Sequence, residues 1–272
     1  MLVVKIGGEL ALEPRHAELD ALVGSVRSLH AAGRPLVVVH GGGPQTSALM
    51  RRLGLEPTMV AGQRVTDEAT LQCMIMAVGG EVNARLTAAL VRGGVPAVGI
   101  SGAAGGCIQC ARRPPRVVSS AGGASVDYGQ VGEITSVDRD LLDLLINASM
   151  VPLVACIGLG EDGALFNVNG DTVAAELASA LRADALVLVT GTSGILRDKD
   201  DPTSRVARLD LAEAEQAIAS GRIAGGMIAK VEEAGRALTR GVARVHVLGA
   251  LTPGALEQEL ERPGSRGTVL RP

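Results

Sequence analysis

The sequence predicts an α/β protein in which a mostly parallel sheet carries helices on both faces. Short apolar runs alternate with longer stretches of helical apolar spacing along the whole chain of 272 residues. The composition is 47% hydrophobic but only 1% aromatic, so the core must be built from Val, Leu, Ile and Ala, which suits parallel strands covered by helices. Glycine-rich loops follow several of these strands, at the sheet edge where α/β proteins bind ligands.

The first half of the chain alternates strands and helices from its beginning. The run LVVKIG predicts a buried strand that ends in glycines, and the helical stretch after it ends at Gly33. A longer helix is predicted from Thr66 to Arg92, with Gly79-Gly80 as a candidate break. Short β-prone pieces between Pro and Gly predict hairpins at the sheet edge over 106–137. The full prediction for this half is strands at 2–7, 35–40 and 95–100 and helices at 16–32, 45–54, 66–92 and 138–148.

The second half continues the same alternation up to the last residues. Strands are predicted at 151–158, 164–169, 184–190 and 243–249, with GTVL as a last strand, and helices at 171–182, 209–220 and 226–240. No internal repeat or low-complexity linker interrupts the pattern, so we expect one domain over 1–272. The motifs fall into two groups, which predicts an N-terminal lobe (1–157) and a C-terminal lobe (158–272).

Composition argues against several classes of partner. A net charge of −3 gives no general attraction to nucleic acid or anionic membrane, and the scarcity of aromatic residues argues against base stacking. No apolar run reaches the ~18 residues of a membrane span, and no signal sequence precedes the first strand, so we expect a cytoplasmic protein. Cys107 and Cys110 form a C-x-x-C, but a second pair of ligands is missing, so we expect reduced thiols and no metal site.

Lysine is scarce in this sequence, and its positions are informative. Of 26 basic residues only Lys5, Lys199 and Lys230 are lysine. An ammonium is a compact point charge with rotatable donors, which the planar guanidinium cannot replace. Lys199 lies in the polar turn RDKDDP and needs no special explanation, whereas Lys5 and Lys230 lie beside glycine-rich segments. This placement suggests a function for these two lysines.

Two glycine motifs follow the first two predicted strands. In Lys5-Ile6-Gly7-Gly8 the glycine amides can donate to phosphate oxygens, although a tight turn explains the motif equally well. In HGGGP (40–44) the glycines open a helix, whose N-terminus favours anions; a flexible loop is the alternative. Neither motif is a Walker A or a G-x-G-x-x-G sequence. We expect His40 to be packed or hydrogen-bonded rather than catalytic.

Polar residues near other strand ends complete the candidate site. Arg64 precedes a helix, where it can form a bidentate bond to a substrate carboxylate or be a surface arginine. Asn167 and Asn169 project to one side of a strand end, and Asp171 either organises lysine ammoniums or caps the next helix. The loop Thr190–Gly194 is a candidate nucleotide cradle, and Lys230 follows a glycine pair by one helical turn.

These motifs together resemble the amino-acid kinase family. The matching segments are, in order, KIGG, VHGGGP, GQRVTD, VGEITSVD, NVNGD, GGMIAK and GTVL, so the resemblance covers essentially the whole chain. It implies a three-layer α/β/α sandwich with a central mostly parallel sheet. It also implies ATP, with Mg²⁺, bound over the C-terminal part and an acylated amino acid over the N-terminal part. The segment VDYGQVGEI (126–134) favours the γ-carboxylate of N-acetyl-L-glutamate as acceptor.

The resemblance assigns roles to individual residues. Lys5 and Lys230 resemble the lysines that stabilise the transition state, and Asp171 resembles the residue that holds them in position. The residues resembling substrate binders are Gly42, Gly43, Arg64 and Asn167; those resembling nucleotide contacts are Gly7, Gly8, Thr190, Gly191, Thr192, Ser193, Gly194, Ile195, Arg222, Ile223 and Ala224. The family also implies a homodimer. Because arginine-inhibited members carry a helix before the first strand, we expect little arginine inhibition here.

Three departures from the family pattern accompany the resemblance. The loop SGAAGG (101–106) lacks the usual acid of S-G-x-D-G, which bears on the substrate lid. Gly191 stands where Asp is frequent, which bears on nucleotide contacts, and GGMIAK lacks the usual Pro before the lysine.

Two alternative functions stay open at this point. Arg112, Arg113 and Arg116 could receive an acidic carrier protein bearing aminoadipate or glutamate, or simply line a solvated loop. A nucleotide-sensing regulatory domain without turnover is the alternative of another class. A dinucleotide oxidoreductase is disfavoured because no G-x-G-x-x-G follows the first strand.

Overall fold

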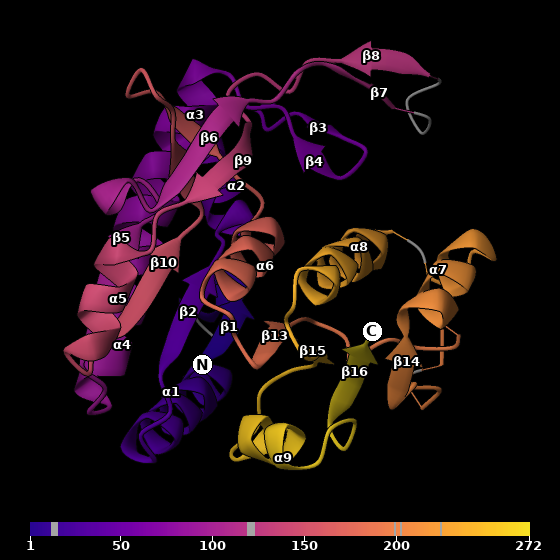
Figure 1. The fold of residues 1–272 in the computed structure, drawn as a ribbon. Coiled ribbons are helices and arrows are strands. Elements are labelled where there is room, and N and C mark those ends of the chain that lie inside the picture. The colour runs from indigo at the N-terminus through magenta and orange to yellow at the C-terminus, as the bar shows by residue number, and fades with distance from the viewer. Residues whose placement is uncertain (12–15, 119–122, 199, 202, 224) are drawn as a thin grey trace.

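An eight-stranded sheet runs through the middle of the molecule, as a computed structural model shows (Figure 1). The structure describes residues 1–11, 16–118, 123–198, 200–201, 203–223 and 225–272. The strand order is β14-β16-β15-β13-β1-β2-β10-β5. Within this sheet, among the strand pairs that the structure describes, only β15 and β16 run antiparallel to each other. The strands are β1 (Leu2–Ile6), β2 (Leu36–His40), β5 (Ala97–Ser101), β10 (Val151–Ala155), β13 (Ala185–Val189), β14 (Arg208–Asp210), β15 (Val245–Leu248) and β16 (Gly267–Arg271).

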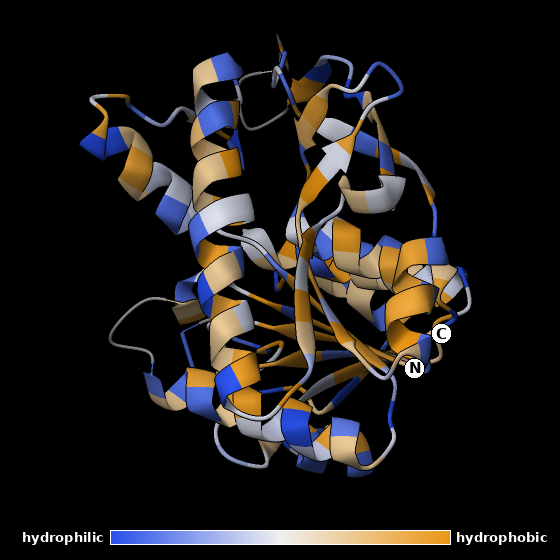
Figure 2. Cartoon of the chain, turned by 90° about the vertical axis from the view of Figure 1, so that its left-hand side faces the viewer, coloured by the Kyte–Doolittle hydropathy of each residue, from blue (hydrophilic) through white to orange (hydrophobic). Residues whose placement is uncertain are grey.

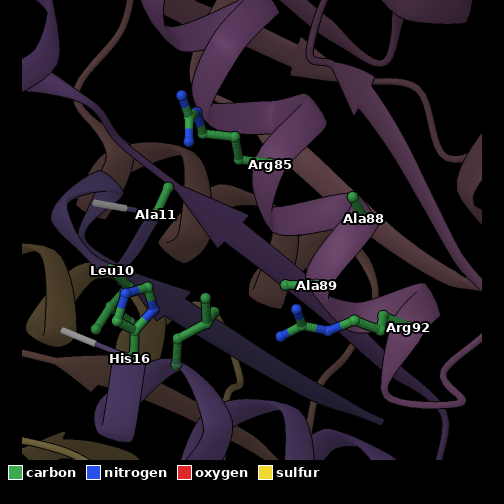
Figure 3. Close-up of a pocket in the computed structure, with 8 residues that line it drawn as sticks. Leu10, Ala11, His16, Arg85, Ala88, Ala89 and Arg92 are labelled. Carbon is green, nitrogen blue, oxygen red and sulfur yellow. The ribbon is translucent and has the colours of Figure 1, made fainter. Parts of the chain in front are cut away.

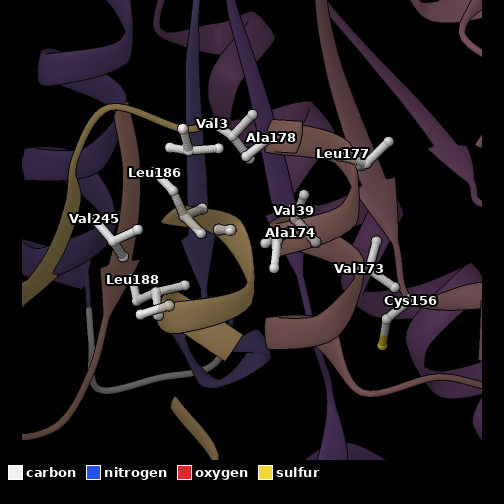
Figure 4. Close-up of a cluster of buried hydrophobic side chains, with 14 of the residues drawn as sticks. Val3, Val39, Cys156, Val173, Ala174, Leu177, Ala178, Leu186, Leu188 and Val245 are labelled. Atoms are coloured by element: carbon white, nitrogen blue, oxygen red, sulfur yellow. The ribbon is translucent and has the colours of Figure 1, made fainter. Parts of the chain in front are cut away.

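Helices cover both faces of this sheet, which confirms the predicted three-layer α/β/α sandwich. Alternate residues of each strand point to opposite faces. Val3 belongs to a core shared with α5 (Asp140–Asn147), α6 (Gly170–Ala180), α7 (Leu211–Ala219) and α8 (Gly226–Thr239), part of which Figure 4 shows. Leu2 and Val4 belong to a second core, on the other face, which includes residues of α1 (His16–Ala31), α4 (Asn83–Arg92) and α9 (Ala255–Glu261). The strands form the apolar centre of the molecule (Figure 2).

A second, four-stranded sheet has the order β12-β11-β6-β9. The β-prone pieces over 106–137 do pair in antiparallel fashion, 108–112 with 132–137 and 116–118 with 124–126. Their predicted place at the edge of the main sheet is wrong, because both pairs lie outside it. The run 151–158 also splits, because β10 ends at Ala155 and the chain crosses to the second sheet at Ile157. The remaining strands are β3 (Met59–Val60), β4 (Gln63–Arg64), β6 (Ile108–Arg112), β7 (Arg116–Val118), β8 (Ala124–Val126), β9 (Gly132–Val137), β11 (Ile157–Leu159) and β12 (Leu165–Asn167).

One helical rod runs from Glu68 to Arg92 as α3 (Glu68–Met74), a π-helix (Ile75–Val82) and α4. The candidate break at Gly79-Gly80 is wrong, since the chain stays helical there and only its hydrogen-bond spacing changes. A Cβ at Gly79 would lie 2.9 Å from Cδ1 of Ile157, so glycine permits this close packing. By length and composition the rod could cross a membrane, but its apolar residues pack into both cores, including Met74, Val78, Val82, Leu86 and Leu90.

The ends of several elements depart from the predicted boundaries. Helix α2 (Gly43–Arg52) begins two residues before the predicted start because Pro44 fits the first helical turn. Helix α9 and strand β14 were not predicted. The tail GTVL does form a strand, β16, although it runs antiparallel to its neighbour β15.

Candidate active site

Asp171 joins two lysines that are 225 residues apart in the sequence. Its Oδ1 lies 2.9 Å from Nζ of Lys5 in an ion pair, and its Oδ2 accepts a 2.6 Å hydrogen bond from Nζ of Lys230. The exposed fractions of the Asp171, Lys5 and Lys230 side chains are 7%, 13% and 21%. The structure thus brings the three residues predicted as catalytic into one cluster, where strand β1 meets helices α6 and α8.

The local sequence explains how these side chains meet. Lys5 lies on β1 two residues after Val3, so it points to the sheet face that α6 and α8 cover. Asn169 caps α6 by accepting a 2.8 Å hydrogen bond from the amide of Asp171, which holds Asp171 in the first helical turn. A Cβ on Gly170 would lie 3.3 Å from Cε of Lys5, so glycine lets the helix start approach the strand closely.

The charges in this cluster favour an incoming phosphate. Burial of Asp171 opposes ionisation, but the charges of Lys5 and Lys230 and their hydrogen bonds outweigh it and hold the pKa of this carboxyl below its usual value. An ionised Asp171 between two ammonium groups leaves a net charge of about +1 in a nearly buried place. Such a cluster can stabilise negative charge that develops on a phosphoryl group.

The two N-terminal glycine motifs pack against each other beside this cluster. A Cβ on Gly8 would lie 2.3 Å from the carbonyl oxygen of Gly41 and 2.7 Å from Cα of Gly42. Gly8 therefore has to be glycine for the HGGGP backbone to come this close. The nearest atoms to a Cβ on Gly7 belong to the flexible carboxylate of Glu9, which can move, so this contact is a weaker reason for glycine.

Arg64 lies over the start of α2, next to the glycine loop. Its Nη2 donates to the carbonyl of Gly43 at 2.9 Å and to Oγ of Ser47 at 2.7 Å. Burial and the nearby charge of Arg51 lower the pKa of Arg64. A guanidinium has five N–H donors, so this position leaves donors for a carboxylate ligand.

Asn167 reaches the same region from the second sheet. Its Nδ2 donates to Oγ1 of Thr66 at 2.9 Å, and Thr66 lies two residues after Arg64. The backbone of Thr66 pairs with Tyr128 and Gln130, within the VDYGQVGEI segment. Arg64, Asn167 and that segment therefore border one region, as the sequence motifs required. Thr66 was not predicted as a site residue, although it lies in the GQRVTD motif at the predicted start of the long helix.

The predicted nucleotide loop follows β13. Thr190 and Thr192 hydrogen-bond to each other in an exposed turn, whereas Ile195 is buried. The Ile195 amide donates to Oγ1 of Thr268 at 2.8 Å, and that hydroxyl donates to the carbonyl of Val206 at 2.5 Å. The Ile195 amide is therefore engaged within the protein, and Thr268 supports the loop from the GTVL strand. GTVL was recognised as a motif, but no role for Thr268 followed from it.

The second nucleotide segment lies at the turn between α7 and α8. Arg222 is exposed and donates to Oγ of Ser220, and Ile223 is buried with its amide bonded to the carbonyl of Ala217. Ala224 lies outside the described residues. Gly225 follows with a positive φ of 58°, which a glycine adopts readily, and α8 begins at the next residue.

The predicted basic cluster is already paired with acidic side chains. Arg112 contacts Asp127, while Arg113 and Arg116 both contact Glu133. Each of the three arginines thus has an acidic partner, although Arg113 and Arg116 share one carboxylate. In the loop SGAAGG, a Cβ on Gly102 would meet Ile108 and the carbonyl oxygen of Ile157, the strand partner of Asn167, and a Cβ on Gly105 would meet Leu141.

The cysteines and a cavity on the α1–α4 face have no part in the predicted chemistry. All four cysteines are buried free thiols, and burial raises the pKa of Cys110 and Cys156 to about 11. In the described part of the chain no three His, Cys, Asp or Glu side chains converge to hold a metal. A cavity of about 280 Å³ on the α1–α4 face contains no predicted site residue (Figure 3); its lining is Leu10, Ala11, His16, Leu19, Arg85, Ala88, Ala89 and Arg92.

Comparison with known proteins agrees with this arrangement. The profile described as the amino acid kinase family matches residues 1–249. The chain belongs to the amino acid kinase family. An amino acid kinase relative from Anaeromyxobacter dehalogenans, named acetylglutamate kinase, is 50% identical over 269 residues, covering 99% of this chain and 98% of the relative. Another of that name, from Sorangium cellulosum, is 48% identical and covers 100% of this chain and 94% of the relative.

A solved structure extends the comparison beyond the kinases. N-acetylglutamate synthase from Neisseria gonorrhoeae, complexed with coenzyme A and N-acetyl-glutamate, matches with a TM-score of 0.82 at 28% identity. The match covers 100% of this chain and 59% of that one. The amino acid kinase fold of this chain is thus shared with part of a larger enzyme.

Proposed function

We propose that this protein transfers the γ-phosphoryl group of ATP to the γ-carboxylate of N-acetyl-L-glutamate. The product is N-acetyl-L-glutamyl 5-phosphate, in arginine biosynthesis. The observation that carries the proposal is the Lys5–Asp171–Lys230 cluster beside the packed glycine loops. Full-length relatives at about half identity, all named acetylglutamate kinase, support the choice of acceptor.

The proposed reaction needs positioning and charge rather than a base. A carboxylate oxygen of the acceptor supplies the electron pair for the new O–P bond. The bond from Pγ to the β–γ bridging oxygen breaks, and its electrons leave with ADP. Because the acceptor is already ionised, no proton has to be removed. Lys5 and Lys230 stabilise the charge spread over the phosphoryl oxygens, and Asp171 keeps both ammonium groups aimed at it.

The two substrates are proposed to bind on opposite sides of the lysine cluster. Arg64 and Asn167 would bind the acylated amino acid in the N-terminal lobe (1–157), with Gly42 and Gly43 near the transferred group. The loops 190–195 and 222–224 would bind ATP in the C-terminal lobe (158–272). Mg²⁺ would arrive with the triphosphate, whose oxygens are its preferred ligands, and would neutralise part of its charge.

The alternative functions receive less support. A carrier-linked acceptor would need a free basic surface, but Arg112, Arg113 and Arg116 are paired with acids. A regulatory domain without turnover would have no need for the intact lysine cluster.

A homodimer in the cytoplasm completes the proposal. Strand β5 ends the main sheet, and Val91 on the adjacent helix α4 is 53% exposed, so a second copy could cover this edge. Sedimentation velocity checks this point: a monomer at all concentrations would contradict it.

ADP release with N-acetyl-L-glutamate, aminoadipate, glutamate and aspartate offered in parallel tests the proposed activity. N-acetyl-L-glutamate should be strongly preferred, and Lys5→Ala and Lys230→Ala should each lower kcat by about 10²–10⁴-fold. Lys199→Ala is the matched control, because Lys199 belongs to none of the motifs. Near-normal turnover in both site variants, or ATP binding without acceptor-dependent ADP release, would refute the proposal.

A further inference from the structure

We propose that His40 and Asn83 are positioning residues that fix the Gly41–Gly42 peptide, so that the Gly42 amide faces the transferred phosphoryl group. This inference rests on the proposed function for the identity of that group. It gives a role to a histidine that the phosphoryl-transfer chemistry itself does not use.

The first step is a buried hydrogen-bond chain. His40 ends strand β2 and has no exposed surface. Its Nε2 lies 2.9 Å from Nδ2 of Asn83, and its Nδ1 lies 2.9 Å from the carbonyl oxygen of Gly41. These hydrogen bonds thus link the helical rod, through the imidazole of His40, to the first glycine of the HGGGP loop.

The second step assigns the protons in this chain. Nδ2 of Asn83 also lies 3.3 Å and 3.2 Å from the carbonyl oxygens of Ile100 and Leu153, which identifies it as the amide nitrogen. An amide nitrogen only donates, so Nε2 of His40 accepts. Burial lowers the pKa of His40 to about 4, which keeps the ring neutral. The single ring proton is then on Nδ1, and it donates to Gly41.

The third step follows from peptide geometry. In a trans peptide the C=O of one residue and the N–H of the next point in opposite directions. Because His40 holds the Gly41 oxygen, the Gly42 N–H points away from the imidazole. Among the described residues the structure gives this N–H no acceptor, as expected at a helix start. Gly41 also borders Gly170, whose other close neighbour is Lys5.

The surroundings hold this peptide from two further sides. Gly8 packs against the Gly41 oxygen, and a Cβ on Gly42 would lie 2.7 Å from Cγ2 of Val78. Val78 lies in the π-helix, and Asn83 follows directly after it. In an α-helix residues five apart point about 140° away from each other. The i→i+5 bonding of a π-helix brings Val78 and Asn83 closer to one face of the helix. Val78 can therefore contact Gly42 while Asn83 contacts His40.

Kinetics of paired variants test the inference. His40→Leu removes the donor to Gly41, whereas His40→Asn keeps a short side-chain N–H in nearly the place of Nδ1–H. We expect His40→Leu to lower kcat by about 10–100-fold with little change in KM for ATP, and His40→Asn to recover most of that loss. ADP with aluminium fluoride mimics the transferred phosphoryl group. In calorimetry the His40→Leu variant should bind this complex about 10–100-fold more weakly, while the Kd for ADP alone stays unchanged.

Unchanged kcat in a folded His40→Leu variant would overturn the inference, as would equal losses in ADP and ADP–aluminium fluoride binding. A measurement on the unaltered protein covers the case in which the variants do not fold. Nitrogen NMR of its histidines should show one neutral ring with the proton on Nδ1 from pH 8 to pH 5. An Nε2–H tautomer of His40 would refute the geometry itself. Absence of turnover with N-acetyl-L-glutamate in the unaltered enzyme would instead refute the proposed function.

Discussion

Lys230 donates a 2.6 Å hydrogen bond to Asp171, and this contact ties α8 to α6 at the predicted phosphoryl site. Lys5 pairs with the other oxygen of the same carboxylate. One acidic side chain therefore sets the distance between the two ammonium groups, and its replacement should affect both.

Replacement of Asp171 by Asn should lower kcat at least about 10²-fold. The amide keeps the size of the side chain but removes the charge that holds two ammonium groups together. KM for ATP should change much less, because the loop 190–195 is intact. Steady-state kinetics measure both parameters. Asp143→Asn, which removes an exposed pair with Arg139, serves as control and should keep normal kinetics.

Replacement of Arg64 by Lys should raise KM for N-acetyl-L-glutamate about 10–100-fold, with KM for ATP unchanged. Lysine keeps the charge, but it cannot donate to Gly43 and Ser47 while forming a bidentate bond to a carboxylate. The exposed Arg139→Lys, whose partner Asp143 lies outside the site, is the control and should have normal KM values. Equal KM values in the Arg64 variant and the unaltered enzyme would remove Arg64 from the acceptor site.

Replacement of Thr268 by Val should raise KM for ATP about tenfold. Valine has nearly the same shape but leaves the buried Ile195 amide and Val206 carbonyl without their shared hydroxyl partner. Thr268→Ser restores the hydroxyl and should restore KM. A normal KM for ATP in the Val variant would mean that this contact does not shape the nucleotide loop.

Two buried groups should make acid destabilise the protein, each over its own, partly overlapping range of pH. The pKa of His40 is lowered by burial from 6.5 to about 4, so between these values the unfolded chain binds a proton that the folded one does not. The free energy of unfolding should therefore fall by about 3 kcal/mol as the pH drops through that range. Urea titrations from pH 7 to pH 4 measure this slope, which should be smaller in His40→Asn.

The second range lies below pH 4.5 and belongs to Glu259. Burial opposes its ionisation, but hydrogen bonds from His246 and from the amides of Gly264, Arg266 and Gly267 lower its pKa from 4.5 to about 2. Stability from this group is present above pH 4.5 and lost as the pH falls towards 2. A flat stability between pH 7 and pH 5 would contradict the His40 part without affecting the Glu259 part.

The main sheet could be predicted because its strands carry a local signal. The runs that became β1, β2 and β13 are short, apolar and followed by glycines, and each forms where it was predicted. The lysine cluster could be expected because Lys5, Asp171 and Lys230 all lie near strand ends or helix starts of one parallel sheet. Pairing between distant segments carries no such signal. The division at Cys156 between two sheets, and the Asn83–His40 and Thr268–Ile195 contacts, depend on where remote segments meet.

The scarcity of lysine has a practical consequence for spectroscopy. The chain has only four primary amines: the N-terminus, Lys199 and the two lysines that share Asp171. Reductive methylation with ¹³C would therefore give a spectrum in which half of the labelled groups report on the phosphoryl site. The dimethylamino signals of Lys5 and Lys230 would follow nucleotide and acceptor binding directly, without a crowded background of surface amines.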